Sequence, residues 1–113
     1  MKREAFFVHR LDFGRVDDAV REILREVRDG KLDAELRRNG LKRPAVSDLE
    51  EAVSLEGPGA GLSPEAWAEI IVVFGPVAAD AMRDLWRVVV LPRLRRRFGS
   101  DAVRRDDPHQ PDA

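Results

Sequence analysis

The sequence of 113 residues lacks cysteine and tyrosine, and its two histidines, His9 and His109, lie near opposite ends of the chain. Without cysteine the chain has no disulfide, no thiolate ligand for zinc and no thiol nucleophile. Two separated histidines do not offer the clustered ligands of a metal site, so we expect no metal and no cofactor. The fold must then rest on one hydrophobic core. A core suffices at this size, because such a domain buries roughly 65% of its unfolded surface.

Long hydrophobic runs are also missing from the sequence. The longest uncharged apolar run covers ten residues, 70–79, whereas a membrane-spanning helix needs about 20. The apolar stretch after the basic start, residues 5–8, is too short for the apolar part of a signal peptide. These two observations predict a cytoplasmic protein.

Lysine is scarce, since the 20 basic residues include only Lys2, Lys31 and Lys42. Residues 44–82 carry seven acids and no base, a net charge of −7, and residues 83–105 carry eight arginines against two acids, a net charge of +6. The chain is therefore acidic in its middle and basic near its end. An arginine-rich composition is also typical of GC-rich genomes, so the number of arginines alone does not indicate nucleic-acid binding.

Two segments have the alternating pattern of β-strands. Apolar and polar residues alternate over residues 4–12, which predicts a strand with one mainly apolar face. A shorter alternation over residues 51–56 predicts a second strand, and we expect it to pair directly with the first. Between the helices and this strand, residues 44–49 fit one further turn of helix, in which Ser47 and Glu50 have the spacing of a capping box.

Two helices are expected between these strands. The first covers residues 15–29 and ends at Gly30, because apolar residues there recur at the spacing of an amphipathic helix. A shorter helix follows, with Leu32 and Leu36 on one face, and ends at residues 39–40, Asn-Gly.

A glycine-rich loop follows the second expected strand, at residues 57–61, Gly-Pro-Gly-Ala-Gly. The loop lacks the glycine spacing of a dinucleotide fingerprint and the lysine of a phosphate-binding Walker loop, so we interpret it as a connector. Residues 63–65, Ser-Pro-Glu, then combine a capping serine, a first-turn proline and an acid, which is typical of a helix start.

The segment after residue 65 is expected to form a long hydrophobic helix broken by prolines. Its buried face would begin with Trp67, Ile70, Ile71 and Phe74. The residues Gly75-Pro76 should kink it. The apolar stripe then continues to Pro92, after which residues 93–98 would add a last turn.

Together these elements predict a helix-dominated α+β fold: a short N-terminal strand, two helices, a short second strand and the proline-broken helical segment. The alternative is an all-α fold. We expect residues 1–99 to form a single globular domain. Residues 100–113, rich in proline and paired acids, are expected to form a disordered tail.

No catalytic residues are predicted. His9 lies on the apolar side of the first strand, which favours a core histidine over a general base, and the chain offers it no cysteine or tyrosine to activate. The acid pairs are adjacent in sequence rather than placed to face each other across a cleft. A small enzyme that uses His9 stays as an alternative.

The densest cationic segment predicts a partner-binding site. It comprises Arg87, Arg93, Arg95, Arg96 and Arg97. At least two of the last four must point to solvent, because four arginines within five positions cannot share one helical face. We expect this patch to bind an acidic protein partner. Nucleic acid and an anionic membrane surface are the alternatives.

The hydrophobic segment 64–91 has more apolar residues than one face of a small domain requires. We therefore expect a homo-oligomer. The predicted interface residues are Ile71, Phe74, Trp86 and Val89.

Two segments, residues 59–65 (GAGLSPE) and 85–99 (LWRVVVLPRLRRRFG), resemble small uncharacterised proteins of GC-rich bacteria, some of which accompany effector or conflict systems as helper components. The resemblance covers about a quarter of the chain and implies a non-enzymatic accessory role. The resulting functional hypothesis is a protein–protein interaction or accessory protein. A nucleic-acid-binding regulator is the alternative.

Overall fold

The computed structural model describes residues 2–9, 13–56, 67–99 and 103–104. The strands are β1 (Lys2–His9), β2 (Val53–Glu56), β3 (Trp67–Phe74) and β4 (Val103–Arg104), and the helices are α1 (Phe13–Arg28), α2 (Asp33–Arg38), α3 (Ala79–Leu85) and α4 (Leu91–Phe98). A π-helical turn, η2 (Trp86–Val90), joins α3 to α4. More residues lie in helices than in strands, which confirms the helix-dominated α+β prediction.

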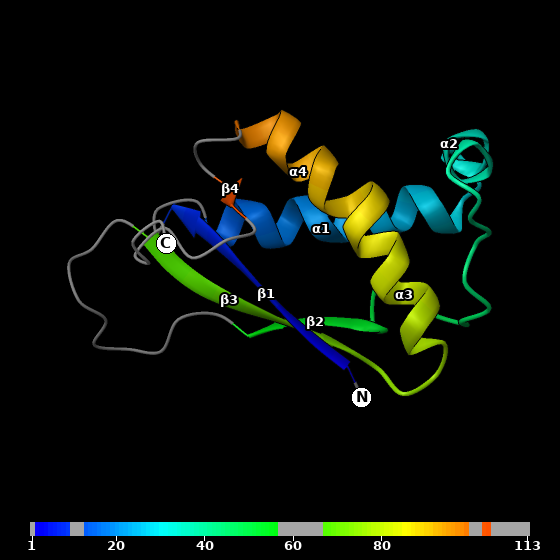
Figure 1. Cartoon of the computed structure of the whole chain (residues 1–113), viewed down its shortest axis with the longest axis horizontal. Coiled ribbons are helices and arrows are strands. Elements are labelled where there is room, and N and C mark those ends of the chain that lie inside the picture. The colour runs from blue at the N-terminus through cyan, green and yellow to red at the C-terminus, as the bar shows by residue number, and fades with distance from the viewer. Residues whose placement is uncertain (1, 10–12, 57–66, 100–102, 105–113) are drawn as a thin grey trace, which may run out of the picture.

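The strands form one antiparallel sheet in the order β2-β3-β1-β4, and Figure 1 shows the helices gathered on one side of it. Alternate residues of the two central strands face these helices, because side chains of a strand point to opposite faces in turn. Phe6 and Val8 of β1 and Ile70, Val72 and Phe74 of β3 are fully buried there. The helices contribute α1's apolar stripe, together with Trp86 and Leu94.

The opposite face of the sheet has fewer buried side chains. Arg3, Ala5 and Glu69 are exposed on it and Ile71 is partly exposed, whereas Phe7 is buried. This difference between the two faces makes the sheet one layer of a two-layer fold, with the core between sheet and helices.

The prediction of helix was wrong for residues 67–74, which form the central strand β3. Ile70 to Phe74 is an unbroken apolar run, and such a run fits a central strand as well as a buried helix. Pairing with β1 along its whole length decides between them. The glycine-rich loop and the expected helix start at residues 63–65 lie outside the described residues.

The expected pairing of the two early strands was also wrong. β2 pairs with β3, with Val53 opposite Phe74, and β1 lies on the other side of β3. Residues 44–49 form no helix, and the side chain that organises the turn is Asp48 rather than Ser47. Its carboxylate accepts hydrogen bonds from the backbone N–H groups of Glu50 and Glu51, at 3.1 and 3.2 Å.

The helix continues through Pro92 to Phe98, in agreement with the last turn expected over residues 93–98. Proline has no N–H to donate to the carbonyl of Val88, and its ring crowds the preceding turn. The chain widens into η2 just before it, where the Leu91 N–H bonds to the Trp86 carbonyl five residues back. The wider turn lets α3, η2 and α4 run on as one helical segment over the sheet.

The C-terminal boundary of the fold lies beyond residue 99. Val103 is fully buried and β4 pairs with Phe7 and Val8 of β1, so these two residues of the expected tail belong to the sheet. The other residues of that segment lie outside the described part of the chain. Among the described residues, no helix is both long and apolar enough to cross a membrane.

Candidate partner-binding surface

The arginines predicted to bind a partner are mostly engaged within the chain. Arg87 of η2 bonds to Glu4 of β1, and Arg93 of α4 bonds to Glu35 of α2. Arg97 Nη1 lies 3.0 Å from Glu22 Oε2, and Arg96 Nη2 lies 3.8 Å from Glu35 Oε1. Arg95 is exposed and makes no ion pair with any residue that the structure describes. Four of the five charges are thus balanced by a carboxylate nearby.

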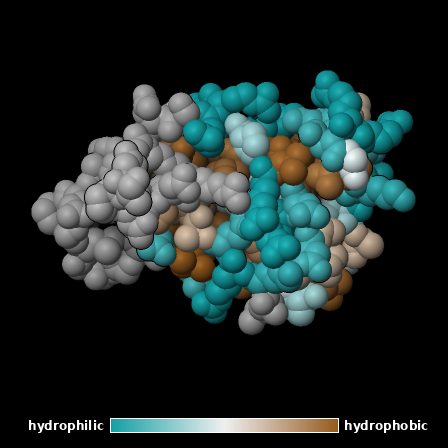
Figure 2. All heavy atoms as spheres, viewed as in Figure 1, coloured by the Kyte–Doolittle hydropathy of each residue, from teal (hydrophilic) through white to brown (hydrophobic). Residues whose placement is uncertain are grey.

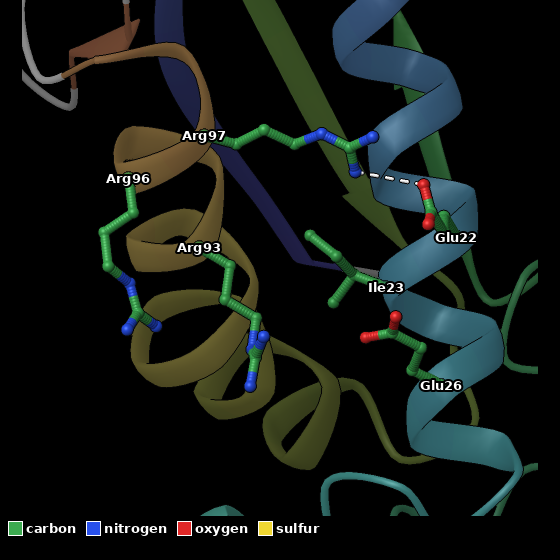
Figure 3. A pocket seen from close by; sticks show the side chains of 6 residues that line it. All are labelled: Glu22, Ile23, Glu26, Arg93, Arg96 and Arg97. Atoms are coloured by element: carbon green, nitrogen blue, oxygen red, sulfur yellow. Dashed lines mark hydrogen bonds and ion pairs between the residues drawn. The ribbon is translucent and has the colours of Figure 1, made fainter.

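A groove of about 340 Å³ separates α1 from α4 at this cluster. Figure 3 shows Arg97 extending across it toward Glu22, with Ile23 and Glu26 on the same wall of α1. Arg93 and Arg96 extend along α4 rather than toward Glu22 in this view. Because the arginines of α4 face the carboxylates of Glu22 and Glu26 on α1, the groove has little net charge with which to attract an anion.

A larger group of cations without a carboxylate partner among the described residues lies around α2. Lys31, Arg37, Arg38 and Lys42 are all exposed, and none forms an ion pair with a residue in the described ranges. Arg43, also exposed, lies 3.2 Å from Asp33 and donates to the Arg28 carbonyl at 3.1 Å. We call these five residues the basic surface. Figure 2 shows hydrophilic side chains projecting at the end of the molecule where Figure 1 places α2.

A turn after α2 brings part of the basic surface together. Gly40 adopts a φ of +71°, a left-handed conformation that glycine adopts without steric cost, and the Leu41 N–H bonds back to the Leu36 carbonyl at 2.8 Å. The chain reverses there. The hollow that results, about 350 Å³, is lined by Asp33, Leu36, Arg37, Leu41, Lys42 and Arg43. Leu41 is half-buried, so this hollow has an apolar wall beside three cations.

Sequence reasoning missed the basic surface because α2 carries its own acids, Asp33 and Glu35. In the fold, Glu35 forms ion pairs with Arg93 and Arg96, which are about 60 positions later in the sequence. Asp33 forms an ion pair with Arg43. The later arginines therefore leave the earlier cations unbalanced. A local count of charges along the sequence cannot detect ion pairs between residues so far apart in the sequence.

The predicted oligomer interface lies largely inside the chain. Phe74, Trp86 and Val89 are at most 1% exposed, and only Ile71 is partly accessible, on the open face of the sheet. The apolar surplus of residues 64–91 arises because this segment supplies both a central strand and the helix that covers it. Three of these four side chains thus have no surface to offer a second copy.

The residues considered for chemistry are only partly described by the structure. His9 is the last residue of β1, and its side chain lies outside the described structure. Within the described ranges, no three histidine or acidic side chains cluster in a way that could hold a metal ion. The pKa of one carboxyl is clearly perturbed: Lys2 beside Asp80 lowers the pKa of Asp80 below its usual value by hydrogen bonding and charge attraction.

Comparison of the chain with models of known protein families, with curated proteins and with solved structures finds no match.

Proposed function

We propose that this chain is a non-enzymatic interaction protein that docks on an acidic protein partner through the basic surface around α2. The observation that carries the proposal is the uneven pairing of charge. Lys31, Arg37, Arg38 and Lys42 keep their charges unpaired among the described residues, whereas four of the arginines near the C-terminal end are balanced.

Unpaired exposed cations act on a partner at a distance. A local excess of one sign raises the association rate with a surface of opposite charge, and salt weakens the effect as the Debye length falls from about 10 Å at 0.1 M to about 3 Å at 1 M. Because the chain's overall charge is −1, this attraction comes from one surface rather than from the molecule as a whole.

The chemistry of the hollow beside α2 favours a protein over a nucleic acid. Leu41 offers apolar contact beside Arg37 and Lys42, which suits a partner with acidic and apolar side chains close together. Binding of single-stranded nucleic acid instead relies on exposed aromatic side chains for stacking. Of the aromatic side chains that the structure describes, Phe6, Phe7, Phe74 and Trp86 are buried, and Phe98 is partly buried against the core. An accessory role alongside a partner protein agrees with this chemistry.

The test compares two triple variants that remove the same amount of charge. Arg37→Ala, Arg38→Ala and Lys42→Ala alter the basic surface, and Arg95→Ala, Arg96→Ala and Arg97→Ala alter α4. The probe is a fluorescent polyglutamate peptide, measured by anisotropy at low and high salt. The first variant should bind at least about 10-fold more weakly than the unmodified chain, and the second should bind within about 2-fold of it.

Equal loss of binding in the two variants would show that total charge, not the basic surface, attracts the anion, and would contradict the proposal. A duplex DNA probe, compared at equal charge and salt, distinguishes the nucleic-acid alternative. Tighter binding of DNA with a steeper salt dependence would favour that regulator instead.

A further inference from the structure

The outer edge of β1 is only partly covered. β4 pairs with Phe7 and Val8 alone, and the remainder of β1, from Lys2 to Phe6, has no strand beside it on that side among the described residues. Figure 1 shows β4 near the arrowhead of β1, while β1 continues well beyond it toward the N-terminus. Arg3 and Ala5 are exposed in this stretch.

The hydrogen-bonding phase of the sheet determines which backbone groups point outward at this edge. The Gly75 N–H bonds to the Ala52 carbonyl, so Val73 and Ile71 direct their backbone groups to β2. The direction of backbone hydrogen bonding alternates from residue to residue along an antiparallel strand, so Val72 and Ile70 direct their N–H and C=O groups to β1. The backbone groups of Glu4 and Phe6, which lie opposite Val72 and Ile70, are therefore hydrogen-bonded to β3.

The N–H and C=O groups of Arg3 and Ala5 consequently point away from the sheet. Two contacts elsewhere agree with this phase. Val103, opposite Val8, donates its N–H to Gly99 rather than to β1, and the outward carbonyl of Val53 on β2 accepts from Arg21 at 2.8 Å. Arg21 also donates to the Glu50 carbonyl, so the β2 edge is partly closed by a side chain. The corresponding groups of β1 have no such cover in the described structure.

We infer that this edge of β1 pairs with the same edge of a second copy of the chain, forming an antiparallel two-fold dimer in which the two sheets join through their β1 strands. The free stretch, residues 2–6, is centred on Glu4. Antiparallel pairing about Glu4 sets each residue of this stretch opposite one in the same stretch of the second copy, and the residues that pair with β4, Phe7 and Val8, lie outside it. The occupant is a second copy because this stretch is complementary to itself in length and register.

The charges along the edge fit this register. Arg3 lies opposite Ala5 of the second copy, so the two exposed arginines do not face each other. The two Glu4 side chains meet at the axis, where each already bonds to its own Arg87. Two carboxylates and two guanidinium groups then form one neutral network. Lys2, on the same side of the strand as Glu4, is likewise balanced by Asp80.

Apolar surface beside the edge supports the same arrangement. Val88 follows Arg87 in η2 and is one of the two large hydrophobic side chains exposed in the described part of the chain. Dimerisation about Glu4 brings the two η2 segments toward each other, since each is tied to the axis by its Glu4–Arg87 pair. Val88 would then lose water contact on dimerisation.

The first test is Ala5→Pro, with Ala5→Ser as the matched control. Proline removes an N–H that donates to no group in the part of the chain that the structure describes, and edge strands accept proline at outward-facing positions. Light scattering coupled to size exclusion should give a dimer for the unmodified chain and for Ala5→Ser, and a folded monomer for Ala5→Pro. A monomeric unmodified chain at millimolar concentration would overturn the inference.

The second test uses the absence of native cysteine. In the proposed register the two Glu4 residues form a non-hydrogen-bonded pair, with Cα atoms about 4.5 Å apart, which a disulfide can bridge. The two Arg3 residues are offset along the strands by about 7 Å and thus separated by about 9 Å, which is too far. Mild oxidation should cross-link Glu4→Cys into a dimer and leave Arg3→Cys largely uncross-linked. Equal cross-linking of both, or of neither, contradicts the register.

Discussion

Arg93 of α4 and Glu35 of α2 form a partly buried ion pair between residues 58 positions apart. Their side chains are 31% and 19% exposed, whereas those of the Arg97–Glu22 pair in the same groove are about half exposed. One neighbouring pair is thus shielded from water and the other is not. Because shielding strengthens charge interactions, the two pairs should differ in their contribution to stability.

Glu35→Ala should lower the free energy of unfolding by about 1–2 kcal/mol, because it leaves the partly buried Arg93 without its acceptor. Glu22→Ala, the control, should cost at most about 0.5 kcal/mol. Urea denaturation followed by circular dichroism measures both. Glu35→Ala should also bind polyglutamate more tightly than the unmodified chain, since it releases both Arg93 and Arg96. Equal stability losses in the two variants would show that burial of this pair is unimportant.

Trp86 is the largest fully buried side chain, with its ring centroid 5.1 Å from that of Phe6 and 6.4 Å from that of Phe74. Trp86→Ala should therefore cost about 3–5 kcal/mol, through lost burial and the cavity left between helix and sheet. Val88→Ala, two positions away on the exposed side of η2, should change stability by about 0.5 kcal/mol or less. Thermal and urea unfolding curves compare the two. An unfolding midpoint of Trp86→Ala close to that of the unmodified chain would contradict the packing described for η2.

The Lys2–Asp80 pair, which joins β1 to α3, predicts a pH dependence. Lys2 and, more weakly, Arg83 lower the pKa of Asp80 below 3.8 in the folded chain. A carboxyl with a lowered folded pKa stabilises the fold above its unfolded pKa, and this contribution is lost as the pH falls through the folded value. The contribution of Asp80 should be constant at neutral pH, begin to fall near pH 3.8 and be lost as the pH falls through the lower folded pKa.

A titration of the Asp80 carboxyl by NMR measures this pKa directly. In Lys2→Gln the pKa of Asp80 should rise back to its usual value of 3.8, because Lys2 is the main cause of its lowering and the attraction of Arg83 is weaker than the opposing effect of desolvation. If the Asp80 carboxyl has the same pKa in the two proteins, Lys2 does not form this ion pair in solution.

The parts of the fold predicted correctly are those whose pattern is local. The first strand and the helix over residues 15–29 were expected within a few residues of β1 and α1, because alternation and amphipathic spacing each depend on neighbouring residues. The second strand, β2, was also predicted. The class of fold followed from these three elements.

Residues 67–74 show why the remainder could not be predicted. Trp67, Ile70, Ile71 and Phe74 have helical spacing, but Ile71 lies on the open face of β3 and Phe74 on the covered face. An apolar residue on a partly open face removes the alternation that would have indicated a strand. The candidate site has the same limitation, since the charges of α2 depend on arginines that only the tertiary fold brings to Glu35.

The position of β1 in the sheet also affects how the chain is made. Its two neighbours both come much later in the sequence: Lys2 pairs with Phe74, and Phe7 with Arg104. At about 5–20 residues per second, ribosomal synthesis of the 57 residues between β1 and β3, residues 10–66, takes roughly 3–11 seconds. During this time Phe6, Phe7 and Val8 have no native strand to pair with, so the nascent chain presents an apolar segment to chaperones while α1 can already form. Folding therefore completes only after most of the chain has been translated, and its rate is limited by closure of this long loop.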